Sequence, residues 1–345
     1  MTGGAGYLGT VIVDQLLARG EDVRVLDLNE PAPRGVGEAS VEVLVGDIRD
    51  RDTVIAACDG VDRIVHSVAQ VPLAKDRHLF HTVNVVGTAE LLRAARDTDV
   101  EKVVHVSSSA IFGIPDTNPV TESTPPRPLE AYGTAKVEAE ALCHEAVAGG
   151  LDVTIIRPRT ILGHGRLGIF GVLFDFVAEG APVFVLDGGT NRYQFVHADD
   201  LTDACLRALD RPGPGTYNIG AADFGTMRDT LQALVDHAGT GSRVRSLPSA
   251  PARVAMRALS TAGLTPFAPY HWLLYGESLW FDTSRAADEL GWKATRSNAE
   301  MVVESYDWYL AHRDDLRGGS AHQSPVELGA LAVLKRLASA APRRG

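Results

Sequence analysis

The sequence predicts an α/β fold in which a doubly wound parallel sheet is followed by a smaller α/β lobe. Short runs rich in Val and Ile alternate with helical patterns through the first half, which indicates βαβ units covered on both faces. A glycine-rich segment opens the first helical pattern. Beyond Pro158 the alternation becomes irregular, as expected of a smaller second lobe. The 345 residues are 45% hydrophobic, so a sizeable core is expected.

The elements of the first half follow in chain order from these patterns. Strands are expected at 23–27, 41–45, 63–66, 103–107 and 153–157. Helices are expected at 10–18, 84–96 and 135–148. The proline-rich stretch 115–128 is predicted to be a surface loop.

Three regions are predicted along the chain. Residues 1–160 form a dinucleotide-binding domain, with return segments near 190–210, and residues 161–315 form a substrate-binding lobe. Residues 316–345 are a tail rich in Ala, Gly and Arg. Its leucines between 328 and 337 indicate a short amphipathic helix that packs on the body or on a second subunit.

The start of the chain departs from the expected pattern. A glycine-rich loop of this kind follows a central strand, yet here it begins at residue 2. Without that strand the two neighbouring strands would lack a partner. We therefore expect the first strand to be missing and the native chain to begin several residues before Met1.

Charge and composition exclude several classes of protein. The net charge is −11 with no long basic run, which disfavours a nucleic-acid partner. No stretch of eighteen apolar residues or signal-peptide pattern occurs, so no membrane association is expected and the cytoplasm is predicted. Cys58, Cys143 and Cys205 are far apart and are predicted to be small buried hydrophobic residues in a reducing compartment.

The N-terminal glycines predict a dinucleotide site. Gly3, Gly6 and Gly9 have GxxGxxG spacing, which permits a tight turn, close approach to a pyrophosphate and close packing of the next helix. A strand ending in Asp27 follows, eighteen residues after Gly9. An acid there accepts hydrogen bonds from the adenosine ribose and repels a 2′-phosphate, so NAD is predicted rather than NADP.

A phenol and an ammonium lie four residues apart at Tyr132 and Lys136, on one face of a helix. A Tyr with a pKa near 10 is a poor base at neutral pH, but a nearby Lys and a positive nicotinamide favour the phenolate. Tyr132 is therefore the predicted catalytic base. A serine cluster at the end of an upstream strand supports a catalytic rather than a chance pair.

At this point the sequence resembles the extended short-chain dehydrogenase/reductase family of NAD-dependent epimerases and dehydratases, which includes the sugar-nucleotide epimerases. The resemblance covers residues 2 to about 310. It is specific for the superfamily and less so for a substrate. It rests on Thr2–Gly9, Asp27, Asp47-Ile48, Asn84–Thr88, Ser107–Gly113, Tyr132–Lys136, Arg157-Pro158, Phe195–Leu201 and Leu290-Gly291-Trp292.

The resemblance implies a Rossmann fold, an NAD cofactor and roles for individual residues. Ser108, counted back from Gly113, matches the catalytic serine and acts with Tyr132 and Lys136. The implied cofactor-binding residues are Gly3, Gly6, Tyr7, Leu8, Gly9, Asp27, Asp47, Ile48, Val68, Ala69, Asn84, Ser107, Tyr132, Lys136 and Pro158. The family is often dimeric through two helices, so a homodimer is expected, with small residues such as Ala135, Ala139, Ala141 and Ala146 permitting close packing.

The two residues after Ser108 narrow the reaction. Family dehydratases and decarboxylases usually carry an acid one or two places later, whereas Ser109 and Ala110 stand here. Reversible oxidation remains, and we favour an epimerase (an isomerase) acting on a nucleotide sugar. The alternative is a dehydrogenase or reductase of a non-nucleotide alcohol or ketone, such as a hydroxysteroid-like or natural-product compound. A catalytically silent NAD sensor is a third, less favoured hypothesis.

The substrate residues are the least constrained. Thr160 stands where sugar-nucleotide epimerases often have Asn, and Arg192 is adjacent to the position where they often have Arg. These departures put a uridine diphosphate ligand in doubt. The candidates are Gln70, Lys75, Ser109, Thr160, Arg166, Arg192 and Gln194. His197, with Asp199 and Asp200, is interpreted as structural, so no metal site is predicted.

Overall fold

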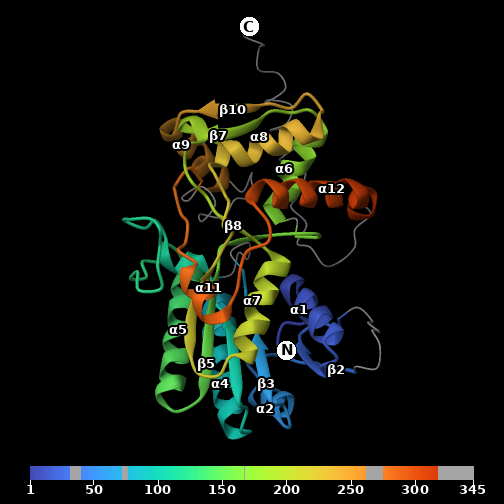
Figure 1. Cartoon of the computed structure of the whole chain (residues 1–345), viewed down its shortest axis with the longest axis vertical. Helices are drawn as coiled ribbons and strands as arrows, with labels where there is room; N and C mark the ends of the chain where they lie inside the picture. The colour runs from blue at the N-terminus through green and yellow to red at the C-terminus, as the bar shows by residue number, and fades with distance from the viewer. Residues whose placement is uncertain (32–39, 72–76, 167, 262–274, 318–345) are drawn as a thin grey trace. The chain divides into compact units, whose positions relative to one another are not determined.

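A computed structural model describes residues 1–31, 40–71, 77–166, 168–261 and 275–317 (Figure 1). The chain divides into two compact units. Unit 1 comprises Met1–Thr160, Val196–Gly220 and Phe281–Thr295. Unit 2 comprises Ile161–Phe195, Ala221–Trp280 and the chain from Arg296 onward. The predicted tail from residue 318 and Lys75 lie outside the described residues.

Unit 1 is the predicted doubly wound α/β domain. Its main sheet has the order β3-β4-β5-β9, with all strands parallel, and β1 pairs parallel with β2. These strands are β1 (Val23–Asp27), β2 (Val41–Val45), β3 (Arg63–His66), β4 (Lys102–Val106), β5 (Asp152–Pro158) and β9 (Gly215–Ile219). The five strands predicted for the first half are therefore confirmed to within one residue at each end.

The expected gap at the first strand is partly filled. Thr2 forms parallel bridges with Leu26 of β1 and His66 of β3. The Leu26 amide donates to the Met1 carbonyl at 2.9 Å, and the Thr2 amide donates to the Val65 carbonyl at 3.0 Å. Among the described residues no strand forms before α1, as expected, but Thr2 pairs with both neighbouring strands, so each of them has a partner at that one position.

Helices cover both faces of this sheet. Helices α2, α4 and α5 contact one another in series, and α1 and α7 contact one another (Figure 1). The elements are α1 (Tyr7–Ala18), α2 (Arg51–Cys58), α3 (Arg77–His81), π-helix η1 (Thr82–Val86), α4 (Gly87–Asp97), 3₁₀-helix η2 (Ser109–Phe112), α5 (Ala131–Ala148), α7 (Ala198–Asp210) and α11 (Ser284–Leu290).

Three of these helices differ in their starts from the prediction. Helix α1 begins at Tyr7, directly after the glycine loop, and α5 begins at Ala131 because the Glu130 carboxylate caps it. The segment predicted as one helix from residue 84 is split, with π-helix η1 preceding α4. Residues 115–128 form a loop as predicted, but Val120 within it is fully buried and pairs with Phe281.

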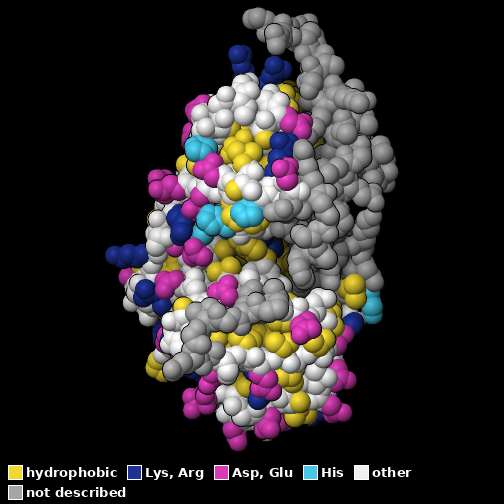
Figure 2. All heavy atoms as spheres, turned by 90° about the vertical axis from the view of Figure 1, so that its right-hand side faces the viewer, with side chains coloured by type: hydrophobic (Ala, Val, Ile, Leu, Met, Phe, Trp, Pro, Cys, Tyr) yellow, Lys and Arg dark blue, Asp and Glu magenta, His cyan; other side chains and the backbone are white. Residues whose placement is uncertain are grey.

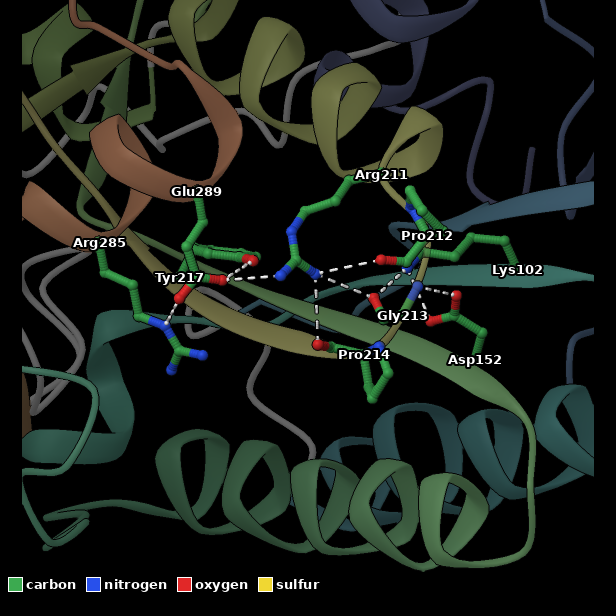
Figure 3. Close-up of polar contacts among 9 residues, drawn as sticks. All are labelled: Lys102, Asp152, Arg211, Pro212, Gly213, Pro214, Tyr217, Arg285 and Glu289. Atoms are coloured by element: carbon green, nitrogen blue, oxygen red, sulfur yellow. Dashed lines mark hydrogen bonds and ion pairs between the residues drawn. The ribbon is translucent and has the colours of Figure 1, made fainter.

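A polar network holds the returning segments of unit 1 to the sheet (Figure 3). Arg211, after α7, donates to the carbonyls of residues 212–214 and to Glu289 of α11. The Tyr217 hydroxyl of β9 donates to the same Glu289 carboxylate at 2.7 Å. Lys102 of β4 binds Asp152 of β5 at 2.7 Å. Segments distant in sequence are thereby joined at one edge of the domain.

Unit 2 has its own core. The parallel pair β10-β7 packs with α6, α8 and α12 around aromatic residues that include Phe174, Tyr306 and Tyr309. Its elements are α6 (Gly168–Ala178), β7 (Val183–Leu186), η3 (Asp187–Gly189), α8 (Met227–Ala238), β10 (Val244–Leu247), α9 (Ser249–Thr261) and α12 (Asn298–Arg317). Strands β6 (Thr160–Leu162) and β8 (Phe195–His197) form a further two-stranded sheet.

The composition is visible on the surface. Figure 2 shows Asp and Glu side chains over the described part of one face, with Lys and Arg scattered among them, in keeping with the net charge of −11. Cys58, Cys143 and Cys205 are buried free thiols, which confirms the prediction of small buried hydrophobic residues. Among the described helices, none combines the length and apolar character needed to span a bilayer.

Candidate active site

The glycine loop closes tightly over the start of α1. Gly3 has a positive φ of 80°, which a glycine adopts without strain. A Cβ added at Gly9 would lie 1.9 Å from the Gly3 carbonyl oxygen, so only glycine fits there. The loop also approaches the end of β3, since a Cβ at Gly3 would lie 3.0 Å from the Val68 amide nitrogen. This cradle fits a pyrophosphate at the N-terminus of α1.

Asp27 is held at the edge of the same loop. Its carboxylate accepts hydrogen bonds from the amides of Ala5 and Asn29, both at 3.0 Å. The side chain is half-buried, and Asp27 is the last residue of β1. A fixed carboxylate at this point suits the hydroxyls of an adenosine ribose and disfavours a 2′-phosphate.

The other predicted cofactor residues differ in exposure. Asp47 forms an ion pair with Arg49 at 2.5 Å, and this hydrogen bonding lowers the pKa of the Asp47 carboxyl. Ile48 is buried against Gly87 at the start of α4. Tyr7, Leu8, Val68 and Ala69 are half-buried beside the loop or at the end of β3, and Pro158 is buried at the end of β5.

Asn84 holds the loop after β3. It is 1% exposed within π-helix η1, and its side chain donates to the Gln70 carbonyl and accepts from the Gln70 amide, at 3.1 and 2.7 Å. Local π-helical geometry is frequent at functional sites. Asn84 therefore holds the backbone of Gln70 at two points, and its supporting role in the active site stays a prediction.

A buried histidine links this clamp to the glycine loop. His66 Nδ1 lies 2.7 Å from the Thr2 hydroxyl, and Nε2 lies 3.0 Å from the Thr88 hydroxyl. Thr88 already donates its proton to the Asn84 carbonyl, so His66 donates from Nε2 and accepts at Nδ1. Burial, followed by the charge of Lys136, lowers the pKa of His66 to about 3, which keeps the ring neutral.

We expect the protein to lose stability as the pH falls below about 6.5. The folded-state pKa of His66 lies near 3, and burial holds the pKa of neighbouring His105 well below its usual value. The unfolded chain takes up protons at these histidines below about pH 6.5 while the folded chain does not, so each destabilises the fold by about 1.4 kcal/mol per pH unit. Urea unfolding at a series of pH values measures how steeply the free energy of unfolding falls with pH. The variant His66→Asn removes one of the two histidines, so the fall should become less steep. A midpoint independent of pH from 7 to 5 would contradict the prediction.

Tyr132 and Lys136 lie one turn apart at the start of α5. Glu130 caps this helix through the amides of Tyr132 and Gly133, at 2.7 and 2.8 Å. Lys136 is 2% exposed, and its Nζ donates to the Val106 carbonyl at 2.8 Å. Burial lowers the pKa of Lys136 to about 8, although Cys143 and Glu140 act to raise it. A buried ammonium and a helix N-terminus both favour a phenolate at Tyr132.

The three serines after β4 have different surroundings. Ser107 is buried, and its hydroxyl donates to Glu140 at 2.5 Å. Ser109 is also buried. Ser108 is half-buried, and its Oγ accepts from the Ala110 amide at 3.1 Å, which leaves the hydroxyl proton for another acceptor. Helix α5 approaches this segment closely, because a Cβ at Gly133 would lie 2.6 Å from the Ala110 carbonyl oxygen.

The predicted substrate residues fall into both units. Gln70, Ser109 and Thr160 belong to unit 1, whereas Arg166, Arg192 and Gln194 belong to unit 2. The Arg192 guanidinium lies 4.7 and 4.6 Å from the ring centres of Phe224 and Trp280. Gln194 is 1% exposed and its amide donates to the Ala221 carbonyl, so this donor is engaged within unit 2.

Two features had no counterpart in the sequence analysis. One is the pair of hydrogen bonds that His66 makes with the hydroxyls of Thr2 and Thr88. Its only sequence signal is a histidine at the end of an apolar strand. The other is a cavity of about 380 Å³ in unit 1, assembled from segments far apart in sequence. It is lined by Thr121, Glu122, Ser123, His144, Arg157, Thr216 and Arg285.

With this geometry in place, comparison with known proteins decides the family. Residues 1–220 match the model of the NAD dependent epimerase/dehydratase family. The chain belongs to the NAD-dependent epimerase/dehydratase family. As a member of this family it is an enzyme of the extended short-chain dehydrogenase/reductase type that uses NAD. The glycine cradle and Asp27 fit that cofactor, and the predicted fold and family are confirmed.

Relatives of this epimerase/dehydratase-family enzyme have differing activities. An uncharacterized protein of Sinorhizobium fredii is 50% identical, over 97% of this chain and 84% of that protein. A 4-hydroxy-2-methyl-3-oxo-4-farnesyl-3,4-dihydroquinoline-1-oxide ketoreductase of Stigmatella aurantiaca is 30% identical, over 85% of this chain and 90% of that protein. A UDP-glucose 4-epimerase of Mycolicibacterium smegmatis is 28% identical, over 90% and 97%.

A solved structure agrees with this assignment. The UDP-glucose 4-epimerase of Thermus thermophilus, in complex with NAD, is 27% identical with a TM-score of 0.70. The alignment covers 90% of this chain and 97% of that one. The Rossmann fold of the enzyme is thereby established over most of the chain.

Proposed function

We propose that this enzyme is an NAD-dependent epimerase that acts on a sugar nucleotide through transient oxidation of a carbinol. The observation that carries the proposal is the arrangement at the start of α5, where the buried Lys136 lies one turn after Tyr132, together with the half-buried Ser108 just after β4. This set supplies a base, a cation that favours its ionised form and a hydroxyl donor. Such a set serves reversible oxidation of an alcohol.

Each of the three side chains has a separate task in this proposal. The Tyr132 phenolate removes the proton of the substrate hydroxyl, and the Lys136 ammonium stabilises that phenolate. Ser108 donates a hydrogen bond to the substrate oxygen as its charge grows. Bound NAD supplies the hydride acceptor, and Gly9 and Asp27 would hold its pyrophosphate and ribose. When the hydride returns to the substrate carbon, Tyr132 would return the proton to the substrate oxygen, and the face that receives the hydride decides the configuration of the product.

The residues after Ser108 favour epimerisation over elimination. Ser109 and Ala110 are both buried and neither carries a carboxylate. An elimination would need a further acid or base near the substrate carbon. The Mycolicibacterium relative named UDP-glucose 4-epimerase supports the same direction.

The test is the cofactor content of the purified enzyme, followed by turnover of UDP-galactose. An epimerase returns its hydride to the same substrate, so we expect about one NAD per chain to be retained and UDP-glucose to form without net NADH. Proton NMR of the sugar anomers measures the conversion. An empty cofactor site, together with NADH accumulating from a non-nucleotide alcohol, would overturn the proposal.

The second candidate is a reductase of a non-nucleotide ketone. It is favoured by the Stigmatella ketoreductase, 30% identical over 85% of this chain. It is also favoured by Arg192, whose guanidinium lies over the rings of both Phe224 and Trp280, since that surface suits a flat hydrophobic ligand as well as a phosphate. Stoichiometric oxidation of NADH by a cyclic ketone would identify this activity.

The remaining expectations are proposals of the same kind. We place substrate recognition in unit 2, with Arg166 and Arg192 as its cationic residues, and the enzyme in the cytoplasm. A homodimer is still proposed, but Ala135, Ala139 and Ala146 are buried within the chain and only Ala141 is exposed. Light scattering at assay concentration measures the oligomeric state.

A further inference from the structure

A buried ion pair lies one turn beyond Lys136. Glu140 of α5 and Arg157 of β5 are 5% and 7% exposed. Arg157 donates to both carboxylate oxygens, from Nε at 3.0 Å and from Nη2 at 2.6 Å. Such a two-point contact fixes the direction as well as the distance of the two groups. Breaking a buried pair leaves an uncompensated charge, so each partner depends on the other.

This pair is connected to the predicted catalytic segment. Ser107 donates to the same Glu140 oxygen at 2.5 Å, and it directly precedes Ser108. The third nitrogen of Arg157 donates to the Glu122 carbonyl at 3.1 Å. The carboxylate of Glu140 therefore ties the end of β4, strand β5 and helix α5 to one point. Tyr132, Lys136 and Glu140 follow one another at four-residue intervals along that helix.

The charges around Lys136 come from few groups. His66 of β3 and His105 of β4 are buried and neutral, and burial raises the pKa of the Cys143 thiol to about 12. Glu140 is a buried carboxylate that raises the pKa of Lys136, and Arg157 is the cation that balances it. The other carboxylates near Tyr132 and Lys136 on this helix are Glu130, which is half-buried at the N-cap, and Glu138, which is exposed. The other elements packed against α5 carry mostly exposed charges, namely His78 and His81 of α3 and Arg93, Arg96 and Asp97 of α4. Glu90 of α4 is half-buried, and Asp152 lies at the far end of β5. The 3₁₀-helix η2 contains no titratable side chain.

We propose that Glu140 and Arg157 are positioning residues of this site, which anchor the Ser107–Ser108 segment and keep the charge beneath Tyr132 and Lys136 balanced. The inference rests on the proposed role of Tyr132 as the base. Neither residue contacts the substrate in this scheme. Their effect passes through the ammonium of Lys136 and the backbone of Ser108.

The test removes one charge at a time. Glu140→Gln leaves Arg157 unbalanced, so the pKa of the Tyr132 phenol should fall, whereas Arg157→Met leaves Glu140 unbalanced and should raise it. A unit charge within one or two helical turns, partly screened, corresponds to about one pH unit in each direction. The double variant should return close to the wild-type value. If the Glu140–Arg157 pair had a purely structural role, all the variants would change the pKa of the Tyr132 phenol in the same direction.

The readout is the near-ultraviolet absorbance of tyrosinate in the NAD-bound enzyme, titrated with pH. Each charge variant is compared with the same variant carrying Tyr132→Phe, so the difference reports Tyr132 alone. The matched control is Lys102→Met, which breaks a part-buried ion pair at the opposite ends of β4 and β5 (Figure 3). This control should lower the free energy of unfolding without changing the pKa of the Tyr132 phenol.

Shifts of the two single variants in the same direction, or no shift in either, would overturn the inference. An equal shift in the Lys102 control would do so as well. Should the single charge variants fail to fold, Ser107→Ala keeps both charges and removes only the anchor of Ser108. We then expect kcat to fall about tenfold with KM little changed, and an unchanged kcat would refute the anchoring role. Full turnover by Tyr132→Phe would instead refute the proposed function itself.

Discussion

Replacement of Tyr132 by Phe is expected to reduce kcat by about 10³-fold and to leave the affinity for NAD within about threefold. The hydroxyl is the only group removed, and the ring keeps its edge contact with Phe80, whose centre lies 6.1 Å away. Lys136 keeps its hydrogen bond to the Val106 carbonyl. Turnover and NAD binding by calorimetry are the two measurements.

The matched control for this variant is Tyr217→Phe. Tyr217 is fully buried in the same unit and donates its hydroxyl to Glu289, so the control removes a buried hydroxyl away from α5 (Figure 3). We expect it to cost about 1 kcal/mol of stability and to retain turnover. Undiminished activity in the Tyr132 variant would exclude Tyr132 as the base.

Replacement of Gly9 by Ala is expected to weaken NAD binding by about 100-fold. The added Cβ would lie 1.9 Å from the Gly3 carbonyl oxygen and 2.8 Å from the Gly4 Cα, both of them backbone atoms that cannot move aside separately. The glycine loop must therefore open or α1 must shift. Overpacking of this kind typically costs about 3 kcal/mol. If that cost falls on the NAD-bound form, it corresponds to an affinity about 100-fold weaker.

Gly20→Ala is the control at the other end of the same helix. Gly20 has a φ of 79° and nothing within 4 Å of an added Cβ, so the variant introduces backbone strain without steric overlap. We expect it to lower stability by about 1 kcal/mol and to leave NAD affinity unchanged. Equal loss of affinity in both variants would show that Gly9 acts through general stability.

Local patterns in the sequence were sufficient for the strands and for the main chemical groups. The apolar runs predict five strands to within one residue because a parallel sheet buries both faces of each strand. Gly9, Asp27 and Tyr132 with Lys136 are recognisable because spacing along one loop, strand or helix fixes their geometry. Helix starts were less predictable, since caps such as Glu130 and the π-helical turn at Asn84 depend on neighbouring segments.

The sequence by itself determined the family, the cofactor and the residues offered for catalysis. Only the tertiary structure showed that Ser107 is bound to Glu140 while Ser108 is half-buried, because three adjacent serines look alike until their surroundings are known. It also decided that His66 joins the glycine loop to Thr88, and that Glu140 meets Arg157. These contacts join residues 17 to 64 positions apart, and no periodicity in the sequence encodes pairings over such separations.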